Sequence, residues 1–290
     1  MQIIHTISEI RQRVAADKQD GKTIGFVPTM GNLHQGHLQL VKMALSGSDS
    51  VICSIFVNPL QFGAEEDFAS YPQTLAADAE KLQQLGCDIV FAPAVDEIYP
   101  HSDEGGHSLH GNNQSQVIVP GISDILEGAS RPGHFTGVAT VVAKLFNMVQ
   151  PDKAFFGAKD YQQLQVIKRF VQELCFPVEI LSHPIVREAN GLAMSSRNGY
   201  LTEAQKQQAG EIYQVLQNMA SQIHKGARDF LFLEQTATEH LNQRGFVTDY
   251  IQIRAADLTI PEKQPEHLVI LAAAYLGTTR LIDNIQISLS

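Results

Sequence analysis

Two histidines, His34 and His37, flank a Gln-Gly pair just after an apolar run and a Pro-Thr-Met-Gly turn. Residues 23–28 are predicted to form a strand, and apolar residues recur at helical spacing after His37. A helix N-terminus presents unpaired N–H groups and the positive end of a dipole, which attract phosphate. Gly36 lets a ligand approach the backbone, and imidazoles can donate hydrogen bonds to phosphate oxygens. The motif therefore indicates ATP binding and chemistry at the ATP phosphates.

The histidine pair alone is also compatible with a metal pair or with surface positions near a turn. A zinc site would need further ligands with matching spacing. The three cysteines, Cys53, Cys87 and Cys175, contain no Cys-x-x-Cys pattern that would supply them. These alternatives stay open until the other polar blocks of the chain are considered.

A second block places two amides, Asn58 and Gln61, around a proline at the end of an apolar run. Each amide can donate and accept hydrogen bonds, which suits recognition of hydroxyl and carboxylate groups. The plainer alternative is a turn that begins with Asn before Pro.

Two further blocks offer cations and hydroxyls. Lys159 and Asp160 follow a predicted strand and open a helix, so they can supply a phosphate cation and a helix cap, or only ordinary capping. The run Met194-Ser195-Ser196-Arg197 combines groups that bind phosphate, although a flexible interdomain loop would have a similar composition. A glycine-rich turn around Arg131 precedes a helix that we interpret as core.

The composition limits the class of protein. The 290 residues include 21 Lys and Arg against 31 Asp and Glu, and the net charge of −10 argues against a general nucleic-acid binder. The hydrophobic fraction of 44% supports a substantial core. Three scattered cysteines favour a reducing cytoplasm without disulfides. We see no signal peptide and no apolar run long enough to span a bilayer, so no membrane partner is expected.

Predicted strands and helices follow one another in alternation over residues 1–184, and they position the residues named above. Strands are predicted at 23–28, 50–57, 89–92, 116–119, 153–156 and 178–181. Helices are predicted at 6–16, 37–45, 74–85, 137–149 and 161–174. The alternation predicts an α/β domain with a Rossmann-like parallel sheet, whose ligands bind at the carboxyl ends of the strands. Residues 29–37 and 58–63 should therefore face one crevice.

Residues 185–290 are predicted to form a smaller α+β lid domain. Its helices are expected at 203–225 and 230–245, and its strands at 249–254, 267–275 and 279–287, with a hairpin turn at Gly277-Thr278-Thr279. A His-, Ser-, Gly- and Asn-rich segment, residues 101–116, is expected to be an exposed loop. Its histidines are interpreted as part of a solvated insertion, with metal binding as the alternative.

Taken together, the blocks resemble the pantothenate synthetase (pantoate–β-alanine ligase) family of the nucleotidyltransferase superfamily. His-x-Gly-His alone marks the wider superfamily, whereas Asn-Pro-Leu-Gln-Phe-Gly, Gly-x-Lys-Asp-Tyr-Gln-Gln and Met-Ser-Ser-Arg-Asn together are specific. The matching stretches occur in the family's order and are FVPTMGNLHQGH at 26–37, IFVNPLQFG at 55–63, LEGASRPGHF at 126–135, FGAKDYQQL at 156–164 and REANGLAMSSRNGYL at 187–201.

The resemblance implies a two-step reaction. The carboxylate of pantoate attacks the α-phosphorus of ATP, which releases pyrophosphate and forms pantoyl adenylate. The amine of β-alanine then attacks the acyl carbon and expels AMP. The resemblance also implies Mg²⁺ on the phosphates with few protein ligands, and a homodimer.

The resemblance assigns residue roles by matching positions. His37, His34 and Lys159 would be catalytic, with Ser195, Ser196 and Arg197 offsetting charge on the phosphates. Gln61 and Gln163 would bind pantoate, Gln61 would also touch β-alanine, and Asn58 would support them. Asp160 would hold the ribose and Val186 would line the adenine site. The full predicted ATP site is Met30, Gly31, Asn32, Leu33, His34, Gln35, Gly36, His37, Gly157, Ala158, Lys159, Asp160, Val186, Met194, Ser195, Ser196 and Arg197.

Two departures from the family pattern stand out, since Ala158 replaces a common Glu and Thr136 a common Arg. Neither is a core catalytic position. An adenylyl- or cytidylyltransferase would share His-x-Gly-His but would not need a pair of amides for a dihydroxy acid. A nucleotide-sensing module would not require the histidines, Lys159 and the Ser-Ser-Arg block in one chain.

Overall fold

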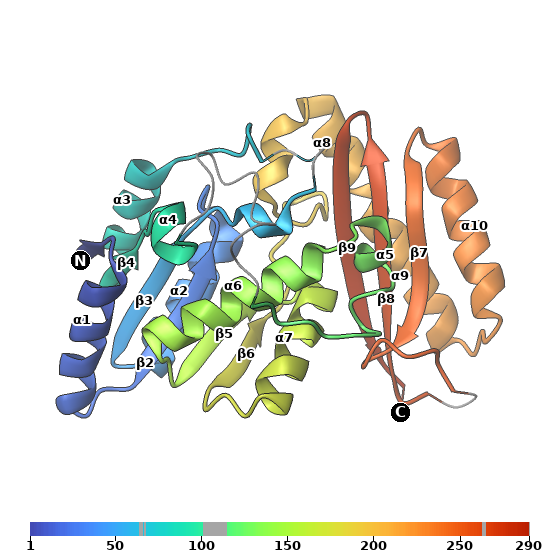
Figure 1. The fold of residues 1–290 in the computed structure, drawn as a ribbon. Coiled ribbons are helices and arrows are strands. Elements are labelled where there is room, and N and C mark those ends of the chain that lie inside the picture. The colour runs from blue at the N-terminus through green and yellow to red at the C-terminus, as the bar shows by residue number, and fades with distance from the viewer. Residues whose placement is uncertain (64–65, 67, 101–114, 263–264, 290) are drawn as a thin grey trace. The chain divides into compact units, whose positions relative to one another are not determined.

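The structure is a computed structural model that describes residues 1–63, 66, 68–100, 115–262 and 265–289. It divides into two compact units (Figure 1). The first comprises Met1–Ala158 and Gln163–His183, and the second comprises Lys159–Gln162 and Pro184–Ser290. The second unit thus includes a four-residue segment that precedes the expected boundary in chain order.

A six-stranded parallel sheet forms the centre of the first unit. Its strand order is β1-β4-β3-β2-β5-β6, and every neighbouring pair is parallel. The order reverses direction between β2 and β5, which in doubly wound sheets marks the place where ligands bind. The α/β class predicted from the sequence is confirmed. The strands are β1 (Gln2–Ile4), β2 (Ile24–Thr29), β3 (Ser50–Ile55), β4 (Ile89–Phe91), β5 (Lys153–Gly157) and β6 (Glu179–His183).

Successive side chains of these strands enter two different apolar clusters. Phe26 and Ile52 belong to one cluster, whereas their neighbours Val27 and Cys53 belong to the other. Strands covered on both faces are mostly apolar, which is why β2 and β3 are nearly continuous apolar runs in the sequence. A sheet of this kind needs helices on both faces.

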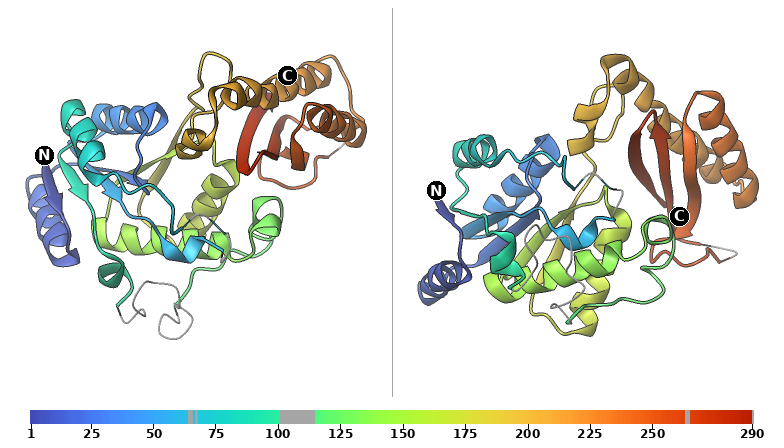
Figure 2. Two further views of the ribbon diagram at one scale, coloured as in Figure 1. Left: turned by 90° about the horizontal axis from the view of Figure 1, so that it is seen from above. Right: turned by 45° about the horizontal axis from the view of Figure 1, so that its top comes forward.

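Helices α1, α6 and α7 contribute to the first cluster, and α2 and α3 pack on the opposite face of the sheet. Figure 2 shows helices on both faces. The helices of this unit are α1 (Ile7–Gln19), α2 (Gln35–Gly47), the 3-10 turn η1 (Pro59–Gln61), α3 (Leu75–Leu85), α4 (Val95–Ile98), α5 (Glu127–Ser130), α6 (His134–Val149) and α7 (Tyr161–Glu173), whose first two residues belong to the second unit.

The second unit contains an antiparallel three-stranded sheet with helices packed on it. Strands β7 (Val247–Ala255), β8 (His267–Leu276) and β9 (Thr279–Ser288) pair in chain order, and Gly277-Thr278 forms the predicted hairpin turn. Alternate residues of β8 share an apolar cluster with helices α9 and α10. The helical segments are η2 (Ser196–Tyr200), α8 (Glu203–Ala209), α9 (Glu211–His224) and α10 (Phe230–Gln243).

Three details differ from the sequence-based expectation. Residues 116–119 form no strand, and the Val117 amide donates to the Thr140 hydroxyl at 3.0 Å. The short edge strand β1 was not expected. The helix predicted at 203–225 is interrupted at Gly210, where an added Cβ would lie 2.5 Å from the Asn190 carbonyl oxygen. Residues 101–114, expected to form a loop, lie outside the described residues.

Across the part of the chain that the structure describes, no helix combines the length and apolarity needed to cross a membrane.

Helix α6 packs on η1 without space for a side chain at Gly137. An added Cβ would lie 2.2 Å from the Leu60 carbonyl oxygen and 2.8 Å from the Gln61 amide nitrogen. We expect Gly137→Ala to lower the free energy of unfolding by about 1–3 kcal/mol, because the clash outweighs the helix propensity gained from alanine. Urea unfolding measures the change.

Gly47→Ala is the matched control for this substitution. It is also a helical glycine, but its added Cβ would meet only the Phe155 ring, at 3.9 Å. An unchanged or raised stability is expected for Gly47→Ala. Equal stability of both variants would show that the contact between α6 and η1 is not tight.

Candidate active site

The turn between β2 and α2 is fixed by a buried carboxylate. Asp78 on α3 accepts the Asn32 amide at 2.7 Å and the Leu33 amide at 2.9 Å. The Thr74 hydroxyl also donates to Asp78 at 2.8 Å. Gly31 and Asn32 both have positive φ, a conformation that glycine and asparagine tolerate best. Asp78 thus supplies the partners that two amides of this left-handed turn require.

His34 and His37 lie at the start of α2, as predicted. The Nδ1 atom of His34 accepts the Gly36 amide at 3.1 Å, and Nδ1 of His37 accepts the His34 amide at 3.4 Å. Since both Nδ1 atoms accept, the proton of each neutral imidazole resides on Nε2. Each ring is therefore in the tautomer that can donate from Nε2 to an anion. The ring centroids are 4.1 Å apart.

The position of Gly36 also favours glycine for a structural reason, apart from the expected approach of a ligand. An added Cβ would lie 2.8 Å from Cε1 of His34. The glycine thus makes room for the capping imidazole.

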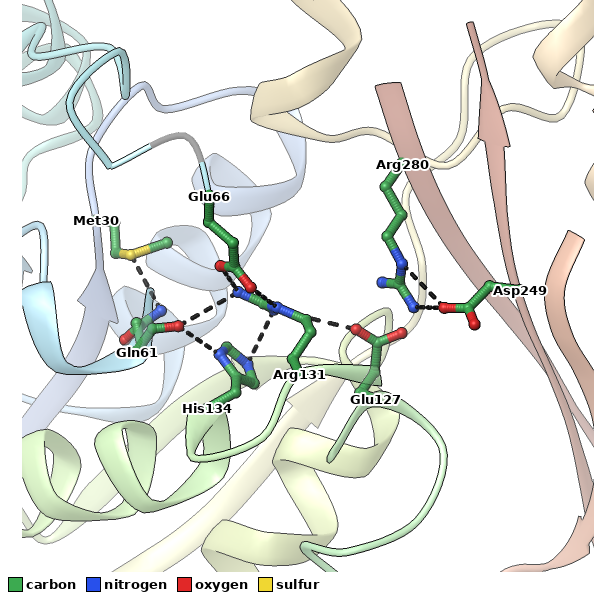
Figure 3. Close-up of polar contacts among 8 residues, drawn as sticks. All are labelled: Met30, Gln61, Glu66, Glu127, Arg131, His134, Asp249 and Arg280. Carbon is green, nitrogen blue, oxygen red and sulfur yellow. Dashed lines mark hydrogen bonds and ion pairs between the residues drawn. The ribbon is translucent and has the colours of Figure 1, made fainter. Parts of the chain in front are cut away.

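Asn58 and Gln61 join the ends of two neighbouring strands. Gln61 donates from Nε2 to the sulfur of Met30 at 3.2 Å (Figure 3). Asn58 donates to the Gln61 side-chain oxygen at 3.1 Å and to the Gly137 carbonyl at 3.2 Å, and it accepts the Tyr99 hydroxyl at 2.8 Å. The predicted amide pair and the predicted phosphate turn therefore meet within the first unit. Asn58 also caps η1, as the turn interpretation of the sequence predicted.

The main chain of Gln61 is held by a cluster that sequence reasoning missed. Its carbonyl oxygen accepts His134 Nδ1 at 2.8 Å and Arg131 Nη2 at 3.3 Å. Arg131 also forms a two-pronged pair with Glu66, at 2.7 and 2.5 Å (Figure 3). The signal in the sequence was the glycine-rich turn that carries Arg131, but nothing in it indicated Gln61 as the partner.

Burial makes His134 a neutral donor. Desolvation, together with the positive charge of Arg131, lowers the pKa of His134 to about 4. The neutral ring donates from Nδ1 to Gln61, and its Nε2 lies 3.2 Å from Arg131 Nη1, where it can accept. Burial works to raise the pKa of Glu66, but the hydrogen bonds and charge of Arg131 outweigh it and lower that pKa. The cluster therefore keeps one protonation state near neutral pH.

The second unit carries the remaining predicted cations and hydroxyls. Asn284 on β9 donates to the Lys159 carbonyl at 2.8 Å. Ser195 caps η2 by accepting the Arg197 amide at 3.2 Å, and the Met194 amide donates to the Val186 carbonyl at 2.9 Å. In the same unit, Arg280 pairs with Asp249 at 2.5 Å (Figure 3).

The other predicted ATP residues are divided between the units. Gly157 ends β5, and buried Ala158 donates its amide to the His183 carbonyl at 2.9 Å. Gln163 lies in the first turn of α7 and belongs to the first unit, whereas Asp160 belongs to the second. Within the described residues, no three His, Cys, Asp or Glu side chains are grouped as a metal site.

Comparisons with known proteins agree along the whole chain. A family model described as pantoate-beta-alanine ligase matches residues 2–286. Pantothenate synthetases of Ectopseudomonas mendocina and Pseudomonas aeruginosa are each 52% identical to the chain, with full coverage of the chain and at least 99% coverage of the relative.

Solved structures give the same result. Pantothenate synthetase from Thermus thermophilus is 41% identical with a TM-score of 0.89, covering 98% of this chain and 99% of its own. Pantoate-beta-alanine ligase from Francisella tularensis, complexed with beta-gamma ATP and beta-alanine, is 36% identical with a TM-score of 0.80. Its coverage is 98% of this chain and 97% of its own.

The low pKa of His134 predicts a pH-dependent stability. Between about pH 6.5, its ordinary unfolded value, and about pH 4, the unfolded chain binds a proton that the folded chain does not. The contribution is complete above pH 6.5 and falls by on the order of 3 kcal/mol as the pH drops through this window.

Urea unfolding of the native protein and of His134→Gln, at pH 7 and pH 5, measures this contribution. Titrating groups distant from His134 cancel in the comparison. We expect the native protein to lose more stability than the variant on acidification. The same loss in both proteins would contradict the neutral, buried state of His134.

Proposed function

The chain belongs to the pantoate-beta-alanine ligase family, and on this premise we propose that it joins pantoate and β-alanine into pantothenate with the consumption of ATP. The Francisella relative's complex with beta-gamma ATP and beta-alanine supports these two as substrates of this chain. The contact of Gln61 with Met30 carries the proposal, because it joins a small-acid amide to the phosphate-binding turn.

The chemistry follows from the two half-reactions. A carboxylate oxygen of pantoate bonds to the α-phosphorus of ATP, and the bond to the pyrophosphate oxygen breaks. The β-alanine nitrogen then bonds to the acyl carbon, loses a proton, and AMP leaves. Donors from Nε2 of His34 and His37 stabilise negative charge on the phosphates as it moves to pyrophosphate. Lys159, Ser195, Ser196 and Arg197 are proposed to offset the same charge.

Substrate recognition is assigned to the amides. Gln61 and Gln163 would bind the hydroxyls and carboxylate of pantoate, with Gln61 also touching β-alanine. Asn58 supports Gln61 through the bond to its side-chain oxygen. Asp160 would hold the ribose, and Val186 would line the adenine site. A clamp on both the side chain and the main chain of Gln61 supports this role, since specific recognition needs a fixed amide.

Magnesium fits this site as an ion carried by ATP. Mg²⁺ commonly takes phosphate oxygens, waters and only one or two carboxylates. The absence of a three-ligand group among the described residues is compatible with that mode. When bound, Mg²⁺ would neutralise part of the phosphate charge.

We also propose a cytoplasmic homodimer, with the second unit acting as a lid. Three free cysteines, two of them buried, support a reducing compartment.

Removal of the Gln61 amide should weaken the binding of pantoate more than the binding of ATP. Gln61→Ala also leaves Asn58 without its amide partner, and a lost buried hydrogen bond costs about 1–3 kcal/mol. Calorimetric titration should show pantoate affinity reduced by about tenfold or more, and ATP affinity nearly unchanged. Gln84→Ala, an exposed glutamine on α3, is the control. An equal loss of affinity for both substrates would contradict the assignment of Gln61 to pantoate binding.

The histidines should serve the adenylation step. We expect His37→Ala to reduce pantoate-dependent exchange of labelled pyrophosphate into ATP by about a hundredfold or more. Supplied with preformed pantoyl adenylate, the same variant should form pantothenate from β-alanine at a much less impaired rate, because this step involves no pyrophosphate. If both half-reactions of the folded variant fall by the same factor, His37 acts beyond the departing pyrophosphate.

A further inference from the structure

A buried ion pair on β9 lies beside the proposed catalytic lysine segment in the second unit. Asp283 and Asn284 are 5% and 2% exposed. Arg187 approaches the Asp283 carboxylate with both terminal nitrogens, at 2.6 and 2.8 Å. Its guanidinium also lies 3.6 Å from the centroid of the Tyr213 ring. Two-pronged pairing and stacking leave this arginine little freedom.

Asn284 links this ion pair to the segment Lys159–Gln162. Its side-chain amide donates to the Lys159 carbonyl at 2.8 Å. Its own main chain is fixed, because its amide donates to the Asp283 carboxylate at 2.7 Å and its carbonyl accepts Arg187 at 3.3 Å. The position of the Lys159 backbone is therefore set from β9.

The other end of the segment has a second anchor. The Tyr161 hydroxyl donates to the Ala256 carbonyl at 2.7 Å. Residues Lys159–Gln162 thus belong to the second unit through contacts at both ends, although the chain before and after them belongs to the first.

Arg187 also orders the Ser-Ser-Arg block. It donates to the Gly191 carbonyl at 2.9 Å and forms an isolated β-bridge with Ala193. The chain continues from that bridge directly into Ser195 and Arg197. Arg187 therefore contacts Asn284 through its guanidinium, and through its main chain it pairs with Ala193, which leads into the Ser-Ser-Arg block.

We propose that Asn284 is a positioning residue for Lys159 in the adenylation step, held in turn by the Arg187–Asp283 pair. The proposal rests on the proposed function of Lys159. Asn284 contacts the Lys159 main chain and acts by keeping the ammonium where charge develops on the phosphates, rather than by binding ATP. Sequence reasoning did not assign it a role.

Asn284→Ala should lower the rate of pantoate-dependent pyrophosphate exchange by about tenfold, because misplacement of a catalytic group by a fraction of an ångström is costly. Gln286→Ala, an exposed amide two residues along the same strand, should leave the rate unchanged. Thermal unfolding of both variants checks that they are folded. Normal exchange by a folded Asn284→Ala protein would overturn the proposal.

A double-mutant cycle separates positioning from a general structural role. Exchange is measured for Lys159→Ala alone and combined with Asn284→Ala. If Asn284 acts through the ammonium, the second substitution adds less than about a twofold loss in the Lys159→Ala background. A full additional tenfold loss would overturn the proposal while leaving the role of Lys159 intact. Near-normal exchange by Lys159→Ala alone would instead overturn the proposed function of Lys159, and the inference with it.

Tyr161→Phe gives a milder test that does not depend on Asn284→Ala folding. It removes one hydroxyl from the second anchor of the same segment. We expect a smaller loss of exchange, about threefold, that also disappears in the Lys159→Ala background. A loss that persists there would contradict anchoring of Lys159 as the cause.

Discussion

One buried carboxylate, Asp78, determines how the phosphate-facing turn is built. The turn places two residues at positive φ and points successive amides toward α3, where the Asp78 carboxylate accepts both. Removal of Asp78 would take an acceptor from both amides, and a buried group left unpaired costs about 1–3 kcal/mol. The direction in which α2 begins, and with it the placement of His34 and His37, follows from this contact.

Gln61 depends on a comparable arrangement in the same unit. Its side chain is oriented by Asn58 and its main chain by His134 and Arg131, so neither half of the residue is left to solvent. Burial keeps His134 neutral, so one ring nitrogen can donate a hydrogen bond while the other accepts one. A short 3-10 turn, which would be mobile alone, thereby becomes a rigid support for an amide.

Local patterns explain what the sequence predicted well. The central strands of the first unit are largely apolar runs, and the His-x-Gly-His start of α2 is visible in four residues. The edge strand β1 was not predicted because three residues give no periodicity, and residues 116–119 are apolar enough to suggest a strand although they form none. The break at Gly210 depends on the approach of Asn190, which no helical pattern records.

The supporting residues could not be predicted for the same reason. Asp78 acts on Leu33 from 45 positions away, and Asn284 acts on Lys159 from 125 positions away. A sequence shows that an aspartate or asparagine is present, but only the packing of distant elements shows which amide or carbonyl it meets. Motifs therefore indicate candidate residues for the chemistry, whereas the residues that fix their positions become visible only in the structure.

Oxygen transfer from the carboxylate reports whether pantoate is activated at the α-phosphorus. Pantoate labelled with ¹⁸O in its carboxylate is converted with ATP and β-alanine, and the products are analysed by mass spectrometry. We expect ¹⁸O in the phosphate of AMP, because the carboxylate oxygen bonded to phosphorus leaves with it. Unlabelled AMP, or label in inorganic phosphate alongside ADP, would contradict the account and indicate attack at another phosphorus.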